Sequence, residues 1–97
     1  MSTQSHKDLY ELLGSVRNRK DIELLLIDLL SPAEIENIAE RWHIMQMVAA
    51  GHSHRAIAKS VGTSIAKVSR CARVVQHGNG AVLESLKRMG KQLKKMK

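Results

Sequence analysis

The stretch Arg55-Ala-Ile-Ala-Lys-Ser-Val-Gly-Thr-Ser-Ile-Ala-Lys-Val-Ser-Arg70 decides the fold of this 97-residue chain. It predicts two short helices, over residues 54–60 and 64–73, that are joined by a turn at Gly62, where glycine tolerates a positive φ. Ala58 is small enough to let the helices approach closely. The apolar residues expected between them are Ile57, Val61, Ile65 and Val68. Two helices joined in this way form the helix-turn-helix unit, which places its second helix in the major groove of DNA.

The polar residues of this stretch are the candidate DNA-binding residues. Near the start of the second helix, Ser64, Ala66 and Lys67 are expected to face base edges, with Ala66 suited to a thymine methyl group and Lys67 to guanine. The expected phosphate contacts are Arg55, Lys59 and Arg73, and Ser69 completes the predicted set. The alternative is that this cationic surface is only solvated, as in many amphipathic helices. The position of the motif in the most basic part of the chain favours DNA binding.

Charge is distributed very unevenly along the chain. The net charge is +7, but residues 52–97 hold eleven Lys and Arg and one acid, Glu84. Such a segment attracts polyanions by releasing their counterions, so nucleic acid is the first expected partner and an anionic membrane surface the second. The alternative function is therefore a nonspecific nucleic-acid or membrane-surface binder that uses residues 87–97 as a cationic amphipathic helix.

The rest of the chain predicts an all-α fold of five to six helices. Besides the central pair, the helices are expected over residues 6–17, 21–30, 32–50 and 81–96. Ser31-Pro32-Ala33-Glu34 has the pattern of a capping box at the start of the long third helix, and Gly51 suits its end. The buried residues expected on that helix are Ile35, Ile38, Ala39, Trp42, Met45, Val48 and Ala49. Those expected on the last helix are Val82, Leu83, Leu86 and Met89.

Length and composition indicate one domain over residues 1–97. Residues 1–51 are expected to form core and dimerisation helices, residues 52–75 the helix-turn-helix, and residues 81–97 a basic C-terminal helix. A chain this short buries little surface, so a second copy is expected to complete its core. The single cysteine, the lack of a signal-type start and the short apolar run over residues 24–30 predict a cytoplasmic protein without a membrane span.

Other kinds of site find little support in the sequence. His52, His54, Cys71 and His77 lack the spacing of a zinc site, and Cys71 is expected to be an inert small residue of the core. No nucleophile motif or phosphate-binding glycine loop is present, which predicts a protein that is not an enzyme.

The segments Leu29-Leu30-Ser31-Pro32-Ala-Glu, Glu40-Arg41, Arg55-Ala-Ile-Ala and Ile65-Ala-Lys-Val-Ser-Arg70, with the loop at Gly51, resemble the tryptophan repressor family. The resemblance covers roughly residues 21–75. It implies an intertwined all-helical homodimer of Trp repressor type that regulates transcription as a repressor on a palindromic operator.

The resemblance also implies a corepressor site for L-tryptophan or a related small molecule. Arg70 would bind the carboxylate, Arg41 would stack on the indole, and backbone carbonyls near Leu30 and Ser31 of the partner chain would accept from the ammonium group. From the residues alone, Arg41 equally suits a surface pair with Asn37 or Glu40, and Arg70 a phosphate contact. Three departures leave the ligand open: Cys71 replaces a glycine, Val74 replaces a serine, and the loop after Gly51 is one residue shorter.

Overall fold

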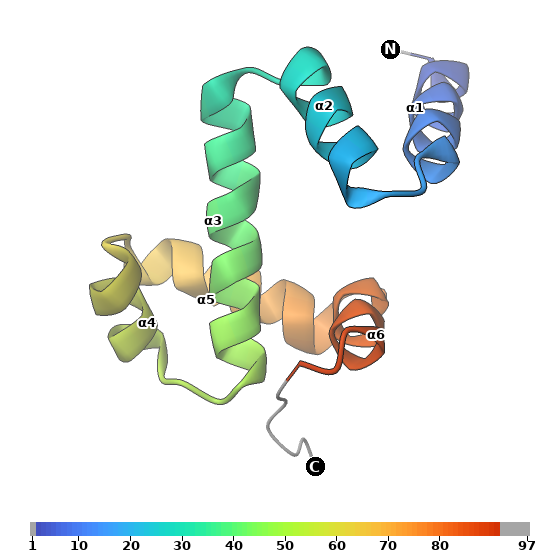
Figure 1. Ribbon diagram of the computed structural model, residues 1–97. Coiled ribbons are helices and arrows are strands. Elements are labelled where there is room, and N and C mark those ends of the chain that lie inside the picture. Colours follow the sequence, from blue (N-terminus) through green and yellow to red (C-terminus); the bar gives the residue numbers. More distant parts are fainter. Residues whose placement is uncertain (1, 92–97) are drawn as a thin grey trace. The chain divides into compact units, whose positions relative to one another are not determined.

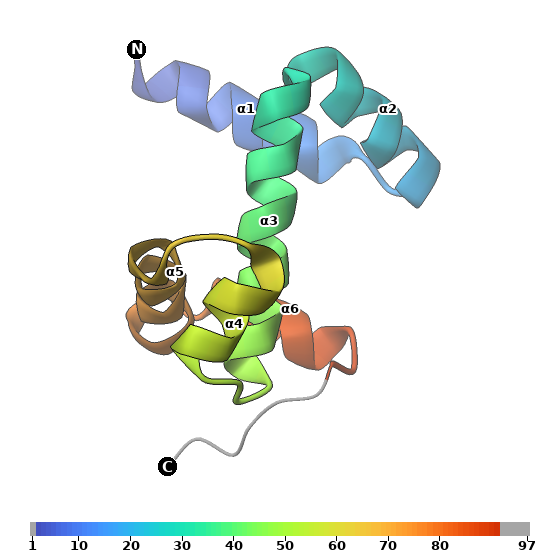
Figure 2. The same cartoon turned by 90° about the vertical axis from the view of Figure 1, so that its left-hand side faces the viewer.

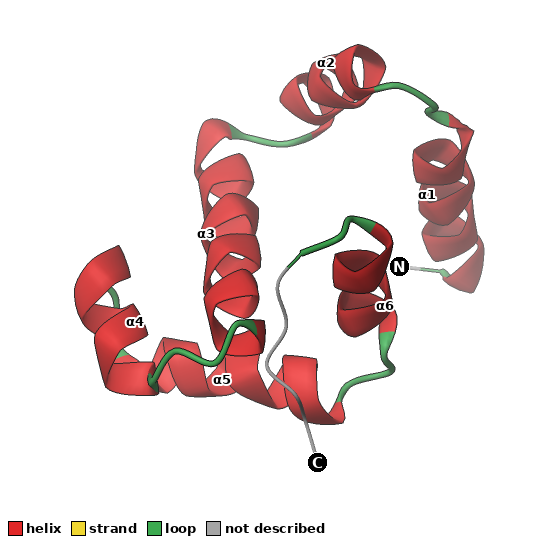
Figure 3. Cartoon of the chain, turned by 60° about the horizontal axis from the view of Figure 1, so that its bottom comes forward, coloured by secondary structure: helices red, strands yellow, loops and turns green. Residues whose placement is uncertain are grey.

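The computed structural model describes residues 2–91, and within that range the chain consists of six α-helices without a strand (Figures 1 and 3). The all-α prediction is therefore confirmed. The helices are α1 (Thr3–Ser15), α2 (Arg19–Leu29), α3 (Pro32–Ala49), α4 (His54–Val61), α5 (Ile65–His77) and α6 (Ala81–Arg88).

Local capping signals explain where most helices begin. At the start of α3, the Ser31 amide donates to Glu34 Oε1 (2.9 Å) and the Glu34 amide donates to Ser31 Oγ (3.2 Å), so the predicted capping box is confirmed. These hydrogen bonds to the Ser31 backbone and hydroxyl lower the pKa of Glu34. Before α4, Ser53 Oγ accepts from the Ala56 amide (3.1 Å). Gly51, at the end of α3, has a φ of 96°, which L side chains rarely adopt.

Several predicted helix boundaries differ from the structure. α1 ends at Ser15 rather than at residue 17, and α5 continues to His77 rather than ending at residue 73. α1 begins at Thr3 because Ser2 caps it, and α2 begins at Arg19 because Asn18 accepts from the Asp21 amide. The last helix was predicted to reach residue 96, but α6 ends at Arg88, and Gly90 follows with a φ of 69°. Residues 92–96 of that predicted helix lie outside the described residues.

The chain divides into two compact units, Met1–Glu36 and Asn37–Lys97, with the boundary inside α3. In the first unit, no side chain of residues 2–36 is buried. Seven large aliphatic side chains of α1 and α2 are exposed: Leu9, Leu12, Leu13, Ile22, Leu24, Ile27 and Leu29. The helices of this unit therefore present an apolar surface that they do not cover themselves.

The second unit has a core that holds α5 in place. A first cluster joins α3, α4 and α5 and consists of Ile44, Ile57, Ala58, Val68 and Cys71. A second cluster joins α3, α5 and α6 and consists of Ala49, Val75 and Leu86, with Trp42, Val82 and Leu83 packed against it. Figure 2 shows α4, α5 and α6 around the C-terminal half of α3, within the unit Asn37–Lys97. Because α5 contributes to both clusters, the core fixes which of its faces is exposed.

Several predicted core residues are wrong. Ile38, Ile65 and Met89 are each more than half exposed, whereas Ile44, which was not predicted, has no exposed surface. A single apolar stripe was expected on α3, but its C-terminal half contacts one cluster on each flank. The buried arc of the helix is therefore wider than the stripe and includes Ile44.

None of the helices within residues 2–91 is long and apolar enough to cross a bilayer.

Candidate nucleic-acid interface

Helices α4 and α5 form the helix-turn-helix that the sequence predicted. Gly62 ends α4 in the left-handed conformation, with φ 79° and ψ 38°. The amides of Gly62 and Thr63 both donate to the Ala58 carbonyl, at 2.9 and 3.1 Å, which closes the turn. Ile57 and Val68 have no exposed surface and pack in the same cluster. The turn and this packing set the position of α5 against α4.

One face of α5 is polar and open to solvent. Val68, Cys71, Ala72 and Val75 are buried. The exposed residues on the opposite side, at helical spacings of three and four, are Ala66, Ser69, Arg70 and Arg73. We call these four residues the outward face. Three predicted DNA-binding residues, Ala66, Ser69 and Arg73, thus lie together on this face beside Arg70.

Helix α4 contributes two further cations. Arg55 and Lys59 are both exposed, and they lie four residues apart on the same side of the helix. They are available for the phosphate contacts that the sequence predicted. At the start of α4, His54 Nδ1 lies 3.4 Å from Ser69 Oγ, so a side chain of α4 also contacts the outward face of α5.

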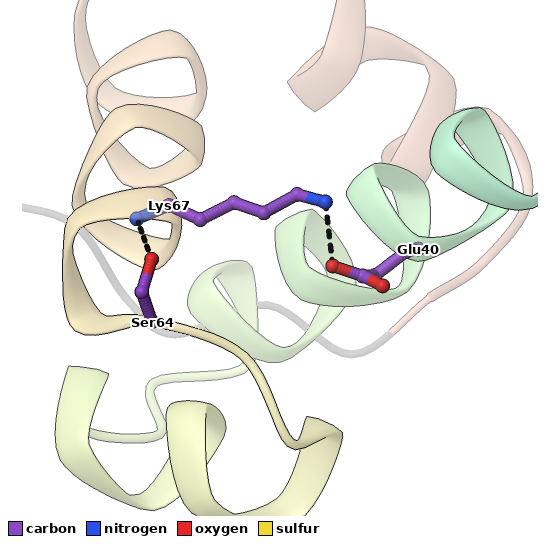
Figure 4. A network of polar contacts seen from close by, with 3 residues as sticks. All are labelled: Glu40, Ser64 and Lys67. Carbon is purple, nitrogen blue, oxygen red and sulfur yellow. Dashed lines mark hydrogen bonds and ion pairs between the residues drawn. The ribbon is translucent and has the colours of Figure 1, made fainter. Parts of the chain in front are cut away.

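Ser64 caps the recognition helix. Its Oγ accepts from the Lys67 amide at 3.1 Å (Figure 4). The hydroxyl proton remains free to donate to a phosphate or a base edge. The amino end of α5 also carries the positive end of the helix dipole, which favours a phosphate group there.

Lys67 differs from the other predicted DNA-binding residues because its side chain forms an ion pair within the protein. Its Nζ is 2.6 Å from Oε1 of Glu40 on α3 (Figure 4), and both side chains are largely covered, with 23% and 34% exposed. The hydrogen bond from Lys67 lowers the pKa of Glu40, with smaller contributions from the charge of Lys67 and the hydroxyl of Thr63. The ammonium group that was expected to read guanine is therefore bound within the protein.

The two arginines of the expected corepressor site both lie close enough to Cys71 for their charges to act on its thiol. Arg41 on α3 and Arg70 on α5 are both exposed. Burial raises the pKa of the Cys71 thiol, and the positive charges of Arg41, Lys67 and Arg70 oppose that shift. Cys71 itself packs in the first core cluster, as predicted. Leu30 is half-buried, and Ser31 is exposed and engaged in the α3 capping box.

Sequence reasoning missed the Glu40–Lys67 ion pair and the exposure of Ile65 at the start of α5. The two charged residues are distant in sequence and carry no shared pattern, so only the packing of α3 against α5 brings them together. Within residues 2–91, no three His, Cys, Asp or Glu side chains lie close enough to hold a metal ion.

The sequence pattern of the Trp repressor protein family matches residues 4–90. The chain belongs to the Trp repressor family. This is a family of DNA-binding regulators rather than of enzymes, and its match spans the helix-turn-helix and both core clusters.

Known proteins are similar to the chain over most of its length. The uncharacterized protein YerC of Bacillus subtilis (strain 168) is 31% identical over 86 residues, which cover 86% of this chain and 83% of YerC. A crystal structure described as a candidate Trp repressor from Staphylococcus aureus has a TM-score of 0.86 and 26% identity, covering 96% of this chain and 93% of that one. A TrpR-like protein from Eubacterium eligens has the same fold, with a TM-score of 0.86, 24% identity and 96% coverage of both chains.

Proposed function

We propose that this protein is a cytoplasmic transcriptional repressor that binds a palindromic operator as a homodimer. The observation that carries the proposal is the exposed outward face of α5. The two core clusters bury the other side of this helix and so leave the outward face accessible to DNA. In the proposed complex, Ala66 contacts a thymine methyl group, while Ser64 and Ser69 donate hydrogen bonds. The phosphate contacts come from Arg55, Lys59 and Arg73.

The homodimer is supported by the uncovered apolar surface of α1 and α2. A unit in which no side chain of residues 2–36 is buried lacks the core that a stable fold needs. Burying the exposed half of one large aliphatic side chain contributes about 1 kcal/mol, so the seven exposed side chains together offer about 7 kcal/mol. We infer that a second copy of the chain covers this surface. Two-fold symmetry then explains a palindromic operator with half-sites about one helical turn apart.

The proximity of Arg41 and Arg70 to Cys71 supports a small-molecule corepressor that carries a carboxylate. L-tryptophan is the first candidate. Arg70 would bind its carboxylate and Arg41 its indole, with Leu30 and Ser31 of the second copy near its ammonium group. Cys71, where the family has a glycine, would crowd the place of the indole, and Val74 stands where the family has a serine. Related carboxylates with a different ring therefore belong in the same test.

The test begins with selection of a duplex from a random pool by the full chain. Binding of the selected duplex and of its scrambled counterpart is then measured by fluorescence anisotropy at fixed salt, with and without L-tryptophan. A repressor binds the selected duplex roughly 10³-fold or more tightly than the scrambled one. Arg73→Ala should weaken both by removing a phosphate contact, whereas Arg88→Ala on α6, which removes the same charge, should have a smaller effect. Equal affinity for both duplexes would instead indicate the nonspecific binder.

A further inference from the structure

The Glu40–Lys67 contact is the only ion pair among residues 2–91, and it joins α3 to the first turn of the recognition helix (Figure 4). Lys67 follows the N-cap Ser64 by three residues, so its position depends directly on where α5 begins. The Glu40 carboxylate on α3 therefore contacts the first turn of the recognition helix directly.

The surrounding charges make this carboxylate difficult to replace. Arg41, Lys67 and Arg70 all act on the thiol of Cys71, and Glu40 is the one acid that acts on it together with them. Without Glu40, the largely covered ammonium group of Lys67 would lie beside α3 without an opposite charge. Glu40 therefore compensates Lys67 where α3 meets the first turn of α5.

We propose that Glu40 is a positioning residue for DNA recognition, which fixes the amino end of α5 against α3 through Lys67. This inference rests on the proposed DNA-binding function. It also changes the role of Lys67, which acts as a link within the protein rather than as a guanine contact. In this arrangement the protein itself holds the recognition helix by an ion pair between α3 and α5.

The sign of the effect of Glu40→Gln separates this role from simple electrostatics. Removing an acid from a DNA-binding surface ordinarily tightens binding to every duplex, because one less negative charge opposes the phosphates. Loss of the positioning contact has the opposite effect on the specific duplex alone. Glu84→Gln is the matched control, because Glu84 is an exposed acid of the same unit and its replacement makes the same change in charge.

The experiment compares the wild-type chain with Glu40→Gln, Glu40→Asp, Lys67→Met, the double variant Glu40→Gln/Lys67→Met and Glu84→Gln. Each is measured on the duplex that the full chain enriches from a random pool and on its scrambled counterpart, with and without L-tryptophan. Glu40→Gln is expected to weaken the selected duplex about two- to fivefold, the range that partly exposed ion pairs contribute, without weakening the scrambled one. Glu40→Asp keeps the charge and should recover most of the loss.

Two further readouts test whether Glu40 acts through Lys67. In the Lys67→Met background, Glu40→Gln should cause no additional loss of specificity, because the contact is already gone. The salt dependence of Lys67→Met should match the wild type, whereas a lysine that contacts a phosphate would lower the slope by about one. NMR titration of Glu40 should show its pKa rising in Lys67→Met in the absence of DNA.

The remaining outcomes overturn the inference. If Glu40→Gln binds the selected duplex as tightly as the wild type, Glu40 has no positioning role. Tighter binding would mean that Glu40 instead holds Lys67 away from DNA. Equal losses on both duplexes with a lower melting temperature would reduce Glu40 to a stability residue. If the pool yields no enriched duplex either with or without L-tryptophan, the proposed function fails and the inference fails with it. Enrichment followed by a neutral Glu40→Gln is a distinct result, because it contradicts the inference alone.

Discussion

Replacement of Ile27 by glutamate gives the sharpest test of the proposed homodimer. Ile27 lies on α2 and 56% of its surface is exposed in the single chain. If a second copy covers it, the substitution removes about 1 kcal/mol of apolar burial and adds at least about 2 kcal/mol for desolvating a carboxylate. Both copies carry the change, so the dimer loses about 6 kcal/mol, which corresponds to a roughly 10⁴-fold increase in the dimer Kd.

The assay is sedimentation equilibrium of the full chain over a concentration series. Lys20→Gln is the matched control, because it is an exposed position on the same helix and shifts the net charge by one unit in the same direction. Its dimer Kd should equal that of the wild type. Ile27→Glu should also bind the selected duplex more weakly than the wild type and Lys20→Gln do. A monomer contacts only one half-site and therefore loses affinity for a duplex with two.

A dimer Kd of Ile27→Glu equal to that of the wild type would contradict the proposed homodimer. In a chain that functions as a monomer, a substitution at a position this exposed changes the free energy of unfolding by about 0.5 kcal/mol or less. The molecular mass seen in sedimentation would then be the same for the variant and the wild type. A wild-type chain that stays monomeric at high micromolar concentration would also contradict it. Either result would leave the apolar surface of α1 and α2 without the partner proposed for it.

The other predictions concern stability. Ser64→Ala removes the acceptor of the Lys67 amide and should lower the free energy of unfolding by about 1 kcal/mol in urea denaturation, whereas Ser64→Thr should keep most of it. Ile57→Ala empties a fully buried position and should cost about 2–5 kcal/mol in the same assay; a loss below about 1 kcal/mol would contradict the observed core. Because the pKa of Glu34 is lowered from 4.5, its contribution is fully present above pH 4.5 and is lost as the pH falls through the lower folded value. Glu34→Gln should remove that part of the acid dependence, and an unchanged profile would count against the capping box as its source.

Features that depend on interactions between residues near in sequence could be predicted before the structure. The hydrogen bonds of Ser31, Ser53 and Ser64 to amides three residues later need only a short segment of chain. Gly62 likewise ends α4 through its own backbone freedom. For this reason the all-α fold, the helix-turn-helix and most of the outward face of α5 could be predicted, together with the family resemblance that they carry.

Tertiary structure decided which face of each helix is covered and which charges meet. An apolar stripe predicts that one side of a helix is buried. In α3 the buried side is wider than the stripe and includes Ile44, because the helix packs in both core clusters. Ile65 on α5 is apolar and yet remains exposed. Lys67 has a basic side chain of the kind that contacts DNA, yet the packing of α3 against α5 places Glu40 at its ammonium group. Charge pairing acts through space over a few ångströms, so no local pattern in the sequence could assign Lys67 to Glu40 rather than to DNA.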